Sequence, residues 1–289
     1  MGEEIRNAGQ SPPSNLKLVH ATQVVSMDEA PVSAVKHKID SSIVKSVSMV
    51  AAGEADAVVS AGNTGAFVAA AQMLLRRLKG VKRPGIAATF PSLSGVCTVI
   101  DVGANIKCKP EHLYQYGVMA SLFTREVVGR KEPRVGLLNI GEEDAKGNEL
   151  VKQTRELLAD SALNFVGNVE GRDIFRGECD VIVCEGFVGN VVLKVSEALA
   201  ESLMDMLRAG TKKDVWCSLG LALCKPVLDD IQNRIDYSEY GGAPLLGVDG
   251  ICIICHGRSD ARAIANAVRE AARFSQHQVN QQIVEELHG

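Results

Sequence analysis

Short apolar runs alternate with longer amphipathic stretches through most of this chain, and this alternation strongly limits its possible folds. The apolar runs lie at 56–60, 97–101, 134–139, 180–184 and 250–255. Continuous apolar runs of this length are typical of parallel strands that are covered on both faces. The stretches with helical periodicity lie at 40–52, 64–79, 111–129, 147–160, 190–208 and 259–286. The pattern predicts a doubly wound α/β fold with a mostly parallel sheet.

One large domain accounts for most of the 289 residues, and no internal repeat is present. Residues 1–15 are polar and contain two adjacent prolines, so we expect them to be disordered, with a single α/β domain over 16–289. The segment 209–240 interrupts the alternation: it begins basic and continues with Trp216 and Leu219. We expect a helical excursion there that contacts a second subunit or a membrane surface. A helix that folds back on its own core is the alternative.

Composition excludes several classes of protein. A hydrophobic fraction of 46% argues against a mainly disordered chain, and a formal net charge of −4 argues against a dedicated nucleic-acid binder. No apolar run approaches the about 18 residues that span a bilayer. The N-terminal stretch has no apolar segment typical of a signal peptide, and the eight cysteines suit reduced thiols. We therefore expect a cytoplasmic protein.

Polar, glycine-bearing loops follow the predicted strands. They lie at 61–66, 102–105, 140–147, 167–173, 185–190 and 256–259. Ordinary turn chemistry explains any one of them alone. Together they suit anion binding, because glycine allows close backbone approach and a helix N-terminus favours negative charge. The neutral candidates for binding a phosphate or a polarised carbonyl are Ser60, Gly62, Asn63, Thr64, Gly65, Asn105, Asn139 and Asn190. Lys146 and Arg172 add positive charge.

Several common motifs are absent from the sequence: the dinucleotide-binding glycine pattern, the Walker A loop and the Gly-x-Ser-x-Gly nucleophile elbow. Cys252, Cys255 and His256 match the pattern of c-type haem attachment. Without an export signal, the segment is better interpreted as a buried strand whose two cysteines point to opposite faces and do not pair. No metal site is expected. His256, at the end of this strand, is either an active-site or a structural residue.

Seven segments taken together resemble the bacterial phosphate acyltransferases of phospholipid synthesis, the PlsX family. They are DAVVSAGNTGA (56–66), DVGAN (101–105), VGLLNIGEEDAKGNEL (135–150), VGNVEGRDIF (166–175), EGFVGNVVLK (185–194), EYGGAPLLGVDG (239–250) and HGRS (256–259). They occur in the family's order, and the resemblance covers residues 18–285. Members usually begin with a further strand bearing a Met-Gly-Gly-Asp-like motif, which has no counterpart here. We therefore expect an open sheet edge or an incomplete site.

The resemblance implies a three-layer α/β/α sandwich, similar to phosphotransacetylases and isocitrate-type dehydrogenases. It also implies a homodimer that transfers a fatty acyl group from acyl carrier protein to inorganic phosphate, giving acyl phosphate without a cofactor. The family is cytosolic and associates peripherally with the membrane, here through 209–225 at the inner face. Nucleic acid is not an expected partner.

Roles for individual residues follow from this chemistry. Lys146 is expected to neutralise charge as phosphate attacks a thioester, with Asn190 donating to the oxyanion and His256 as a further catalytic candidate. An exposed lysine paired with Glu142 or Glu143 is the alternative for Lys146. A basic cluster is expected to dock the acidic carrier protein, or alternatively only to complement a helix C-terminus. It consists of Arg76, Arg77, Lys79, Lys82 and Arg83.

Three alternative functions remain open from the sequence. A dehydrogenase on the related fold would need an adenine site and a cluster of aspartates, and neither is visible. A phosphotransacetylase that uses an acyl-CoA would differ in its donor and in the length of its pocket. An inactive, N-terminally shortened remnant would fold without turning over.

Overall fold

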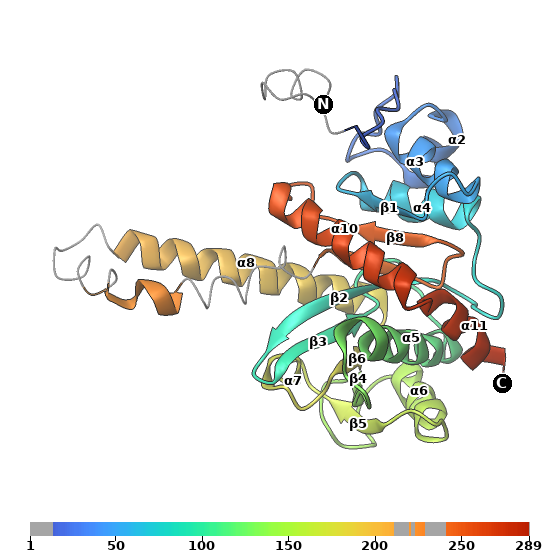
Figure 1. Cartoon of the computed structure of the whole chain (residues 1–289). Helices are drawn as coiled ribbons and strands as arrows, with labels where there is room; N and C mark the ends of the chain where they lie inside the picture. Colours follow the sequence, from blue (N-terminus) through green and yellow to red (C-terminus); the bar gives the residue numbers. More distant parts are fainter. Residues whose placement is uncertain (1–13, 211–219, 221–222, 229–240, 289) are drawn as a thin grey trace.

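The computed structural model describes residues 14–210, 220, 223–228 and 241–288. Eight strands in this part form one sheet in the order β1-β8-β7-β2-β3-β6-β4-β5 (Figure 1). The strands are β1 (Ala57–Ser60), β2 (Gly85–Ser92), β3 (Gly95–Ile100), β4 (Val135–Leu138), β5 (Phe165–Val169), β6 (Val181–Val183), β7 (Ala243–Leu246) and β8 (Ile251–Ile254). Four of the seven neighbouring pairs are parallel, so the predicted mostly parallel sheet is confirmed.

Helices cover both faces of the sheet. The helices are α2 (Pro31–His37), α3 (Ser42–Ala51), α4 (Thr64–Leu74), α5 (Pro110–Phe123), the π-helical turn η1 (Thr124–Val128), α6 (Glu149–Ala159), α7 (Asp173–Arg176), α8 (Gly186–Gly210), α10 (Ala261–Gln276) and α11 (Val279–His288). One apolar core joins the sheet to α3, α4, α7 and the start of α8, and another joins it to α5, α6 and α11. The predicted three-layer α/β/α sandwich is therefore confirmed.

Strand β6 shows how the sequence divides between the two cores. Its three residues are fully buried; Ile182 belongs to the core under α4, whereas Val181 and Val183 belong to the core under α5. Successive side chains of a strand point to opposite faces, so an all-apolar triplet is buried only where helices cover both faces. This apolar run was therefore correctly interpreted as a parallel strand that is covered on both faces.

Two expectations about elements need correction. The single helix predicted over 259–286 is two helices, α10 and α11, because Gln278 between them adopts a left-handed φ of 50°. Strands β2, β5 and β7 lie outside the predicted apolar runs. β2 pairs antiparallel with both β3 and β7, and these connections make the sheet mixed.

Helix α8 projects away from the body of the molecule (Figure 1). The excursion predicted over 209–240 begins at its end, and 211–219, 221–222 and 229–240 lie outside the described residues, as do 1–13 of the predicted disordered segment. Within the described part, no helix combines the length and apolar character needed to cross a membrane.

Candidate functional site

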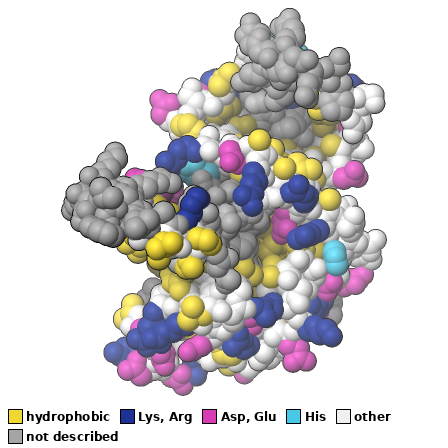
Figure 2. Space-filling model, turned by 60° about the vertical axis from the view of Figure 1, so that its left-hand side comes forward, with side chains coloured by type: hydrophobic (Ala, Val, Ile, Leu, Met, Phe, Trp, Pro, Cys, Tyr) yellow, Lys and Arg dark blue, Asp and Glu magenta, His cyan; other side chains and the backbone are white. Residues whose placement is uncertain are grey.

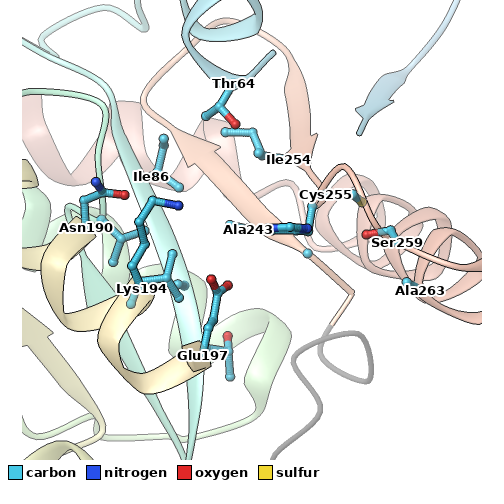
Figure 3. A pocket seen from close by; sticks show the side chains of 16 residues that line it. Thr64, Ile86, Asn190, Lys194, Glu197, Ala243, Ile254, Cys255, Ser259 and Ala263 are labelled. Atoms are coloured by element: carbon cyan, nitrogen blue, oxygen red, sulfur yellow. The ribbon is translucent and has the colours of Figure 1, made fainter. Parts of the chain in front are cut away.

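A pocket of about 150 Å³ lies where the two halves of the sheet meet, and segments far apart in the sequence line it (Figure 3). One face of α8 over residues 190–197 forms one wall, and the loop after β8 with the start of α10 forms another. Strand β2, the start of β7, Val102 and the start of α4 complete the lining. The lining residues are Thr64, Ile86, Ala88, Thr89, Val102, Asn190, Leu193, Lys194, Glu197, Gly242, Ala243, Ile254, Cys255, His256, Ser259 and Ala263.

Three residues that the sequence singled out line this one pocket: Thr64, Asn190 and His256. They come from the ends of β1, β6 and β8. Lys194 and Glu197 also line the pocket but are not among the predicted site residues. Their signal was available, because residues 190, 194 and 197 are spaced i, i+4, i+7 and therefore share one face of α8. Figure 3 shows the side chains of Lys194 and Glu197 directed toward the pocket.

The first turn of α8 is fixed by its N-terminal cap and by a close backbone contact. The Glu185 carboxylate accepts hydrogen bonds from the backbone N–H groups of Phe187 (2.8 Å) and Val188 (3.0 Å), which would otherwise be unpaired at the helix start. A Cβ at Gly189 would lie only 1.9 Å from the carbonyl oxygen of Asp101. Glycine is therefore required there, and it allows α8 to pack directly on the loop 101–105.

Asp101 organises that loop. Its buried carboxylate accepts hydrogen bonds from the backbone N–H groups of Ile86, Gly103, Ala104 and Asn105, at 2.8–3.0 Å. Burial raises the pKa of Asp101, and the hydrogen bonds oppose this shift. A Cβ at Gly103 would lie 3.4 Å from the Asn190 amide oxygen, so the loop sits against the Asn190 side chain. Asp101 thus supports the pocket wall without lining it.

The two predicted asparagine ligands on buried loops already have intramolecular partners. Asn63 caps α4 by accepting from Ala66 N–H (2.9 Å), and it donates to the carbonyl oxygen of Ser26 (2.9 Å). Asn105 donates to the carbonyl oxygen of Pro84 (2.6 Å) and to the hydroxyl of Tyr116 (2.9 Å). Both side chains are buried and hold the loops in place. Neither lines the pocket.

The glycines and Ser60 of the first loop are likewise used locally. Ser60 Oγ accepts a hydrogen bond from Gly62 N–H at 3.3 Å. A Cβ at Gly65 would lie 2.7 Å from the ring of Pro31 at the start of α2, so glycine is needed for that packing. These residues shape the turn that delivers Thr64 to the pocket.

Lys146 and Asn139 lie in the loop after β4, outside the set that lines the pocket. Strand β4 pairs in parallel with β6, so this loop leaves the same edge of the sheet as the segment that leads to Asn190. The Lys146 ammonium lies 4.0 Å from the Glu143 carboxylate, and both side chains are more than half exposed. The Asn139 amide donates to the carbonyl oxygen of Lys146 at 3.2 Å, which ties the loop together. The role expected for Lys146 stays a prediction.

The basic cluster at 76–83 lies at the end of α4 and in the loop that follows it. Lys82 pairs with Glu111 at 3.8 Å, and Arg77 donates to the carbonyl oxygen of Lys82. Arg83 donates to the Asn105 amide oxygen at 3.3 Å, which joins the cluster to the loop 101–105. Arg76 and Lys79 are exposed. Their docking role stays a prediction.

The surroundings of His256, Cys252 and Cys255 do not resemble a haem-attachment site, because the two cysteines are buried free thiols. His256 Nδ1 accepts a hydrogen bond from Arg258 N–H at 3.2 Å, which places the ring proton of the neutral histidine on Nε2. Cys252 and Cys255 are buried free thiols, as predicted, and burial raises the pKa of Cys252 to about 12. Among the described residues, no group of three or more His, Cys, Asp or Glu could hold a metal ion.

Solved structures define the class of fold. The chain superposes on a phosphotransacetylase from Streptococcus pyogenes with a TM-score of 0.56, covering 87% of this chain and 74% of that one at 17% identity. A branched-chain phosphotransacylase from Enterococcus faecalis V583 gives a TM-score of 0.54 over 81% and 78% of the two chains, also at 17% identity. The architecture is therefore that of the phosphotransacylase-like α/β/α proteins.

Sequence comparison narrows this class to a family. The chain belongs to the fatty acid synthesis protein family, which matches residues 3–282. A phosphate acyltransferase from Geotalea uraniireducens is 49% identical over 94% of this chain and 79% of its own length. Another, from Dictyoglomus turgidum, is 48% identical over 95% and 82%. The family resemblance drawn from the seven segments is confirmed.

Proposed function

We propose that this protein is a phosphate acyltransferase that moves a long-chain fatty acyl group from acyl carrier protein to inorganic phosphate, for use in phospholipid synthesis. The observation that carries the proposal is the identity of 46–50% to relatives named phosphate acyltransferase, over 89–95% of this chain. The pocket supports it independently. Ile86, Val102, Leu193 and Ile254 offer an apolar surface for an acyl group, beside the polar Asn190 and Thr64.

The reaction needs no side-chain nucleophile, because phosphate is already one. An oxygen of hydrogen phosphate attacks the thioester carbonyl carbon and forms a C–O bond. The C–S bond of the resulting tetrahedral intermediate then breaks. The proton of hydrogen phosphate passes to the departing thiolate, so the products are acyl phosphate and the free thiol of the carrier. The protein has to hold two anionic groups together and exclude water.

Residues at the pocket suit this task. We expect Asn190, near the start of α8, to donate its amide N–H to the oxyanion that develops on the carbonyl. The Thr64 hydroxyl, at the start of α4, is a donor for phosphate, and the positive end of that helix favours the same anion. His256 is a donor for the leaving sulfur through Nε2. Lys146 supplies positive charge from the rim of the sheet.

The carrier protein is expected to dock on the basic cluster, because acyl carrier proteins are acidic. Arg83 connects this surface to the loop 101–105 through Asn105. Electrostatic attraction at such a surface mainly raises the rate of encounter, so salt should weaken it.

A homodimer is part of the proposal, and α8 supports it. Six large apolar residues of this helix are 39–68% exposed and lie on one stripe: Val188, Val191, Val195, Leu199, Leu203 and Met206. Figure 2, which brings the projecting α8 forward, shows hydrophobic side chains gathered on this face. Peripheral contact with the inner face of the cell membrane is proposed for 209–225, most of which lies outside the described residues, in an otherwise cytoplasmic enzyme.

The test is turnover with a defined donor. The full chain is incubated with long-chain acyl-(acyl carrier protein) and inorganic phosphate, and acyl phosphate is trapped as its hydroxamate. We expect product only when both substrates are present. Preference for acetyl-CoA would contradict the carrier-protein donor and favour a phosphotransacetylase. A folded dimer without product from any donor would contradict the proposed activity altogether.

A further inference from the structure

The described pocket lining contains two oppositely charged side chains, one lysine and one glutamate. Of the 16 described residues in the lining, Lys194 alone carries a permanent positive charge, and Glu197 alone carries a carboxylate. Figure 3 shows the Lys194 ammonium directed from α8 toward the opposite wall, where β7, β8 and the start of α10 lie. Any anion that enters this pocket meets the Lys194 side chain.

Among the described residues, Lys194 has no ion-pair or hydrogen-bond partner, unlike two other cations that lie near the candidate site. Lys146 lies 4.0 Å from Glu143, and Arg258, beside the pocket residue His256, lies 2.9 Å from Glu201. Glu197 is one turn from Lys194 on the same helix, yet the two do not form an ion pair within 4.0 Å. The Lys194 ammonium is exposed and hydrated, so it can bind an incoming anion without first breaking an internal salt bridge.

The neighbours of Lys194 are suited to a tetrahedral oxyanion. Asn190 lies one turn earlier on the same face of α8, and Thr64 faces the pocket from the start of α4. An ammonium and an amide from α8 and a hydroxyl from α4 give three kinds of donor, and the ammonium supplies the charge. The apolar floor formed by Ile86 and Ile254 strengthens this attraction, because nearby apolar surface lowers the local dielectric constant.

We propose that Lys194 is the residue that binds inorganic phosphate for the acyl transfer, a role separate from the charge expected of Lys146. This inference rests on the proposed function. Glu197 acts in the opposite direction: its carboxylate lies on the same wall and repels phosphate, which keeps the anion from binding too tightly to react or leave. Removing the two charges should therefore change phosphate affinity in opposite directions.

The experiment measures phosphate binding directly, without turnover. Melting temperature is recorded against inorganic phosphate, with chloride at equal ionic strength as the reference, because a ligand that binds only the folded state raises it. For K194Q we expect phosphate affinity to fall about 10- to 100-fold, and for E197Q we expect it to rise. K194R should retain part of the affinity. K152Q, which removes an exposed lysine of α6, is the matched control and should behave as wild type.

Kinetics supply the second measurement. In K194Q the KM for phosphate should rise by the same factor while the KM for the acyl donor stays constant, a split that a merely structural role would not produce. Unchanged phosphate affinity in K194Q, or loss of affinity in K146Q but not in K194Q, would overturn the inference. Absence of acyl phosphate from wild type would instead overturn the proposed function, and the binding measurement would still decide the role of Lys194.

Discussion

Lysine side chains show what the sequence can and cannot predict about individual residues. Lys146 is conspicuous in the sequence because it lies in a glycine-rich loop after a strand, and its surroundings are now clear: an exposed loop beside Glu143. Lys194 looks like an ordinary helix residue in the sequence, and only the fold reveals that its ammonium faces a pocket. Loop chemistry is thus visible in a sequence, whereas the direction in which a helical side chain points depends on packing.

Replacing Lys146 with alanine tests the first of these lysines. We expect kcat to fall about 10²- to 10³-fold, the usual effect of removing one group that stabilises transition-state charge. Stability should stay the same, because the pair with Glu143 is exposed and such pairs contribute little. Acyl phosphate formation and the melting temperature are the measurements, with Lys152→Ala as the control. Near-normal turnover of the variant would remove Lys146 from the mechanism.

Glu270 on α10 predicts how stability depends on pH. Burial raises the pKa of its carboxyl from 4.5 to about 7, against a smaller opposing effect of Arg273. The folded chain therefore keeps this proton at pH values where the unfolded chain has lost it. The stabilisation is complete below pH 4.5 and is lost as pH rises through about 7, a change on the order of 3 kcal/mol.

Glu270→Gln should abolish this dependence. The variant should be more stable than wild type at pH 8 and similar to it at pH 4, as measured by urea unfolding across the pH range. Glu156→Gln, an exposed position of α6, is the control and should leave the pH profile unchanged. A variant with the wild-type profile would show that Glu270 does not titrate as proposed.

At the scale of elements, each continuous apolar run correctly predicted a strand, whereas strands without such a run were not predicted. The predicted strands became β1, β3, β4, β6 and β8, because each is apolar on both faces. Strand β2 contains two alanines and Pro91, and β7 is a four-residue segment with Pro244. Proline and alanine disfavour strands, so local sequence hid both. Pairing with neighbours outweighed that preference, and such pairing is not visible in a single sequence.

The loop 101–105 gives a prediction about how one element positions another. In Asp101→Asn, an amide N–H₂ would face backbone N–H groups that now share a carboxylate, leaving buried donors unpaired. We expect the free energy of unfolding to fall by about 3 kcal/mol, and turnover to fall because the loop supports Asn190. Urea unfolding and acyl phosphate kinetics test both effects. Asp160→Asn, at the exposed end of α6, is the control, and equal stability of the two variants would contradict this account.

At the scale of the whole molecule, the fold brings distant residues together. Thr64 and His256 are 192 positions apart in the sequence, and both line the same pocket. The sequence identified both residues as ends of strands, but it did not show that these ends meet. Strand order decides that, since antiparallel β2 and β7 lie between the two parallel groups of strands. The candidate site could therefore be predicted as a set of loops, whereas the pocket itself required the topology.

Assembly of two copies through α8 is the prediction at this largest scale. The exposed stripe contains Leu199 at 58% and Leu203 at 50% exposure, and burying a leucine fully stabilises by about 1.5–3 kcal/mol. Replacing both with glutamate would place four charges in the proposed dimer interface. We expect the wild type to sediment as a dimer and the double variant as a folded monomer in analytical ultracentrifugation.

A control separates this interface from a general effect of surface charge. Leu157→Glu changes a leucine of α6 that is 39% exposed and lies away from α8, so that variant should remain a dimer. Circular dichroism confirms that each variant is folded. A monomeric wild type would contradict the proposed dimer. A double variant that still sediments as a dimer would show instead that another surface joins the two copies and that the apolar stripe of α8 serves a different contact.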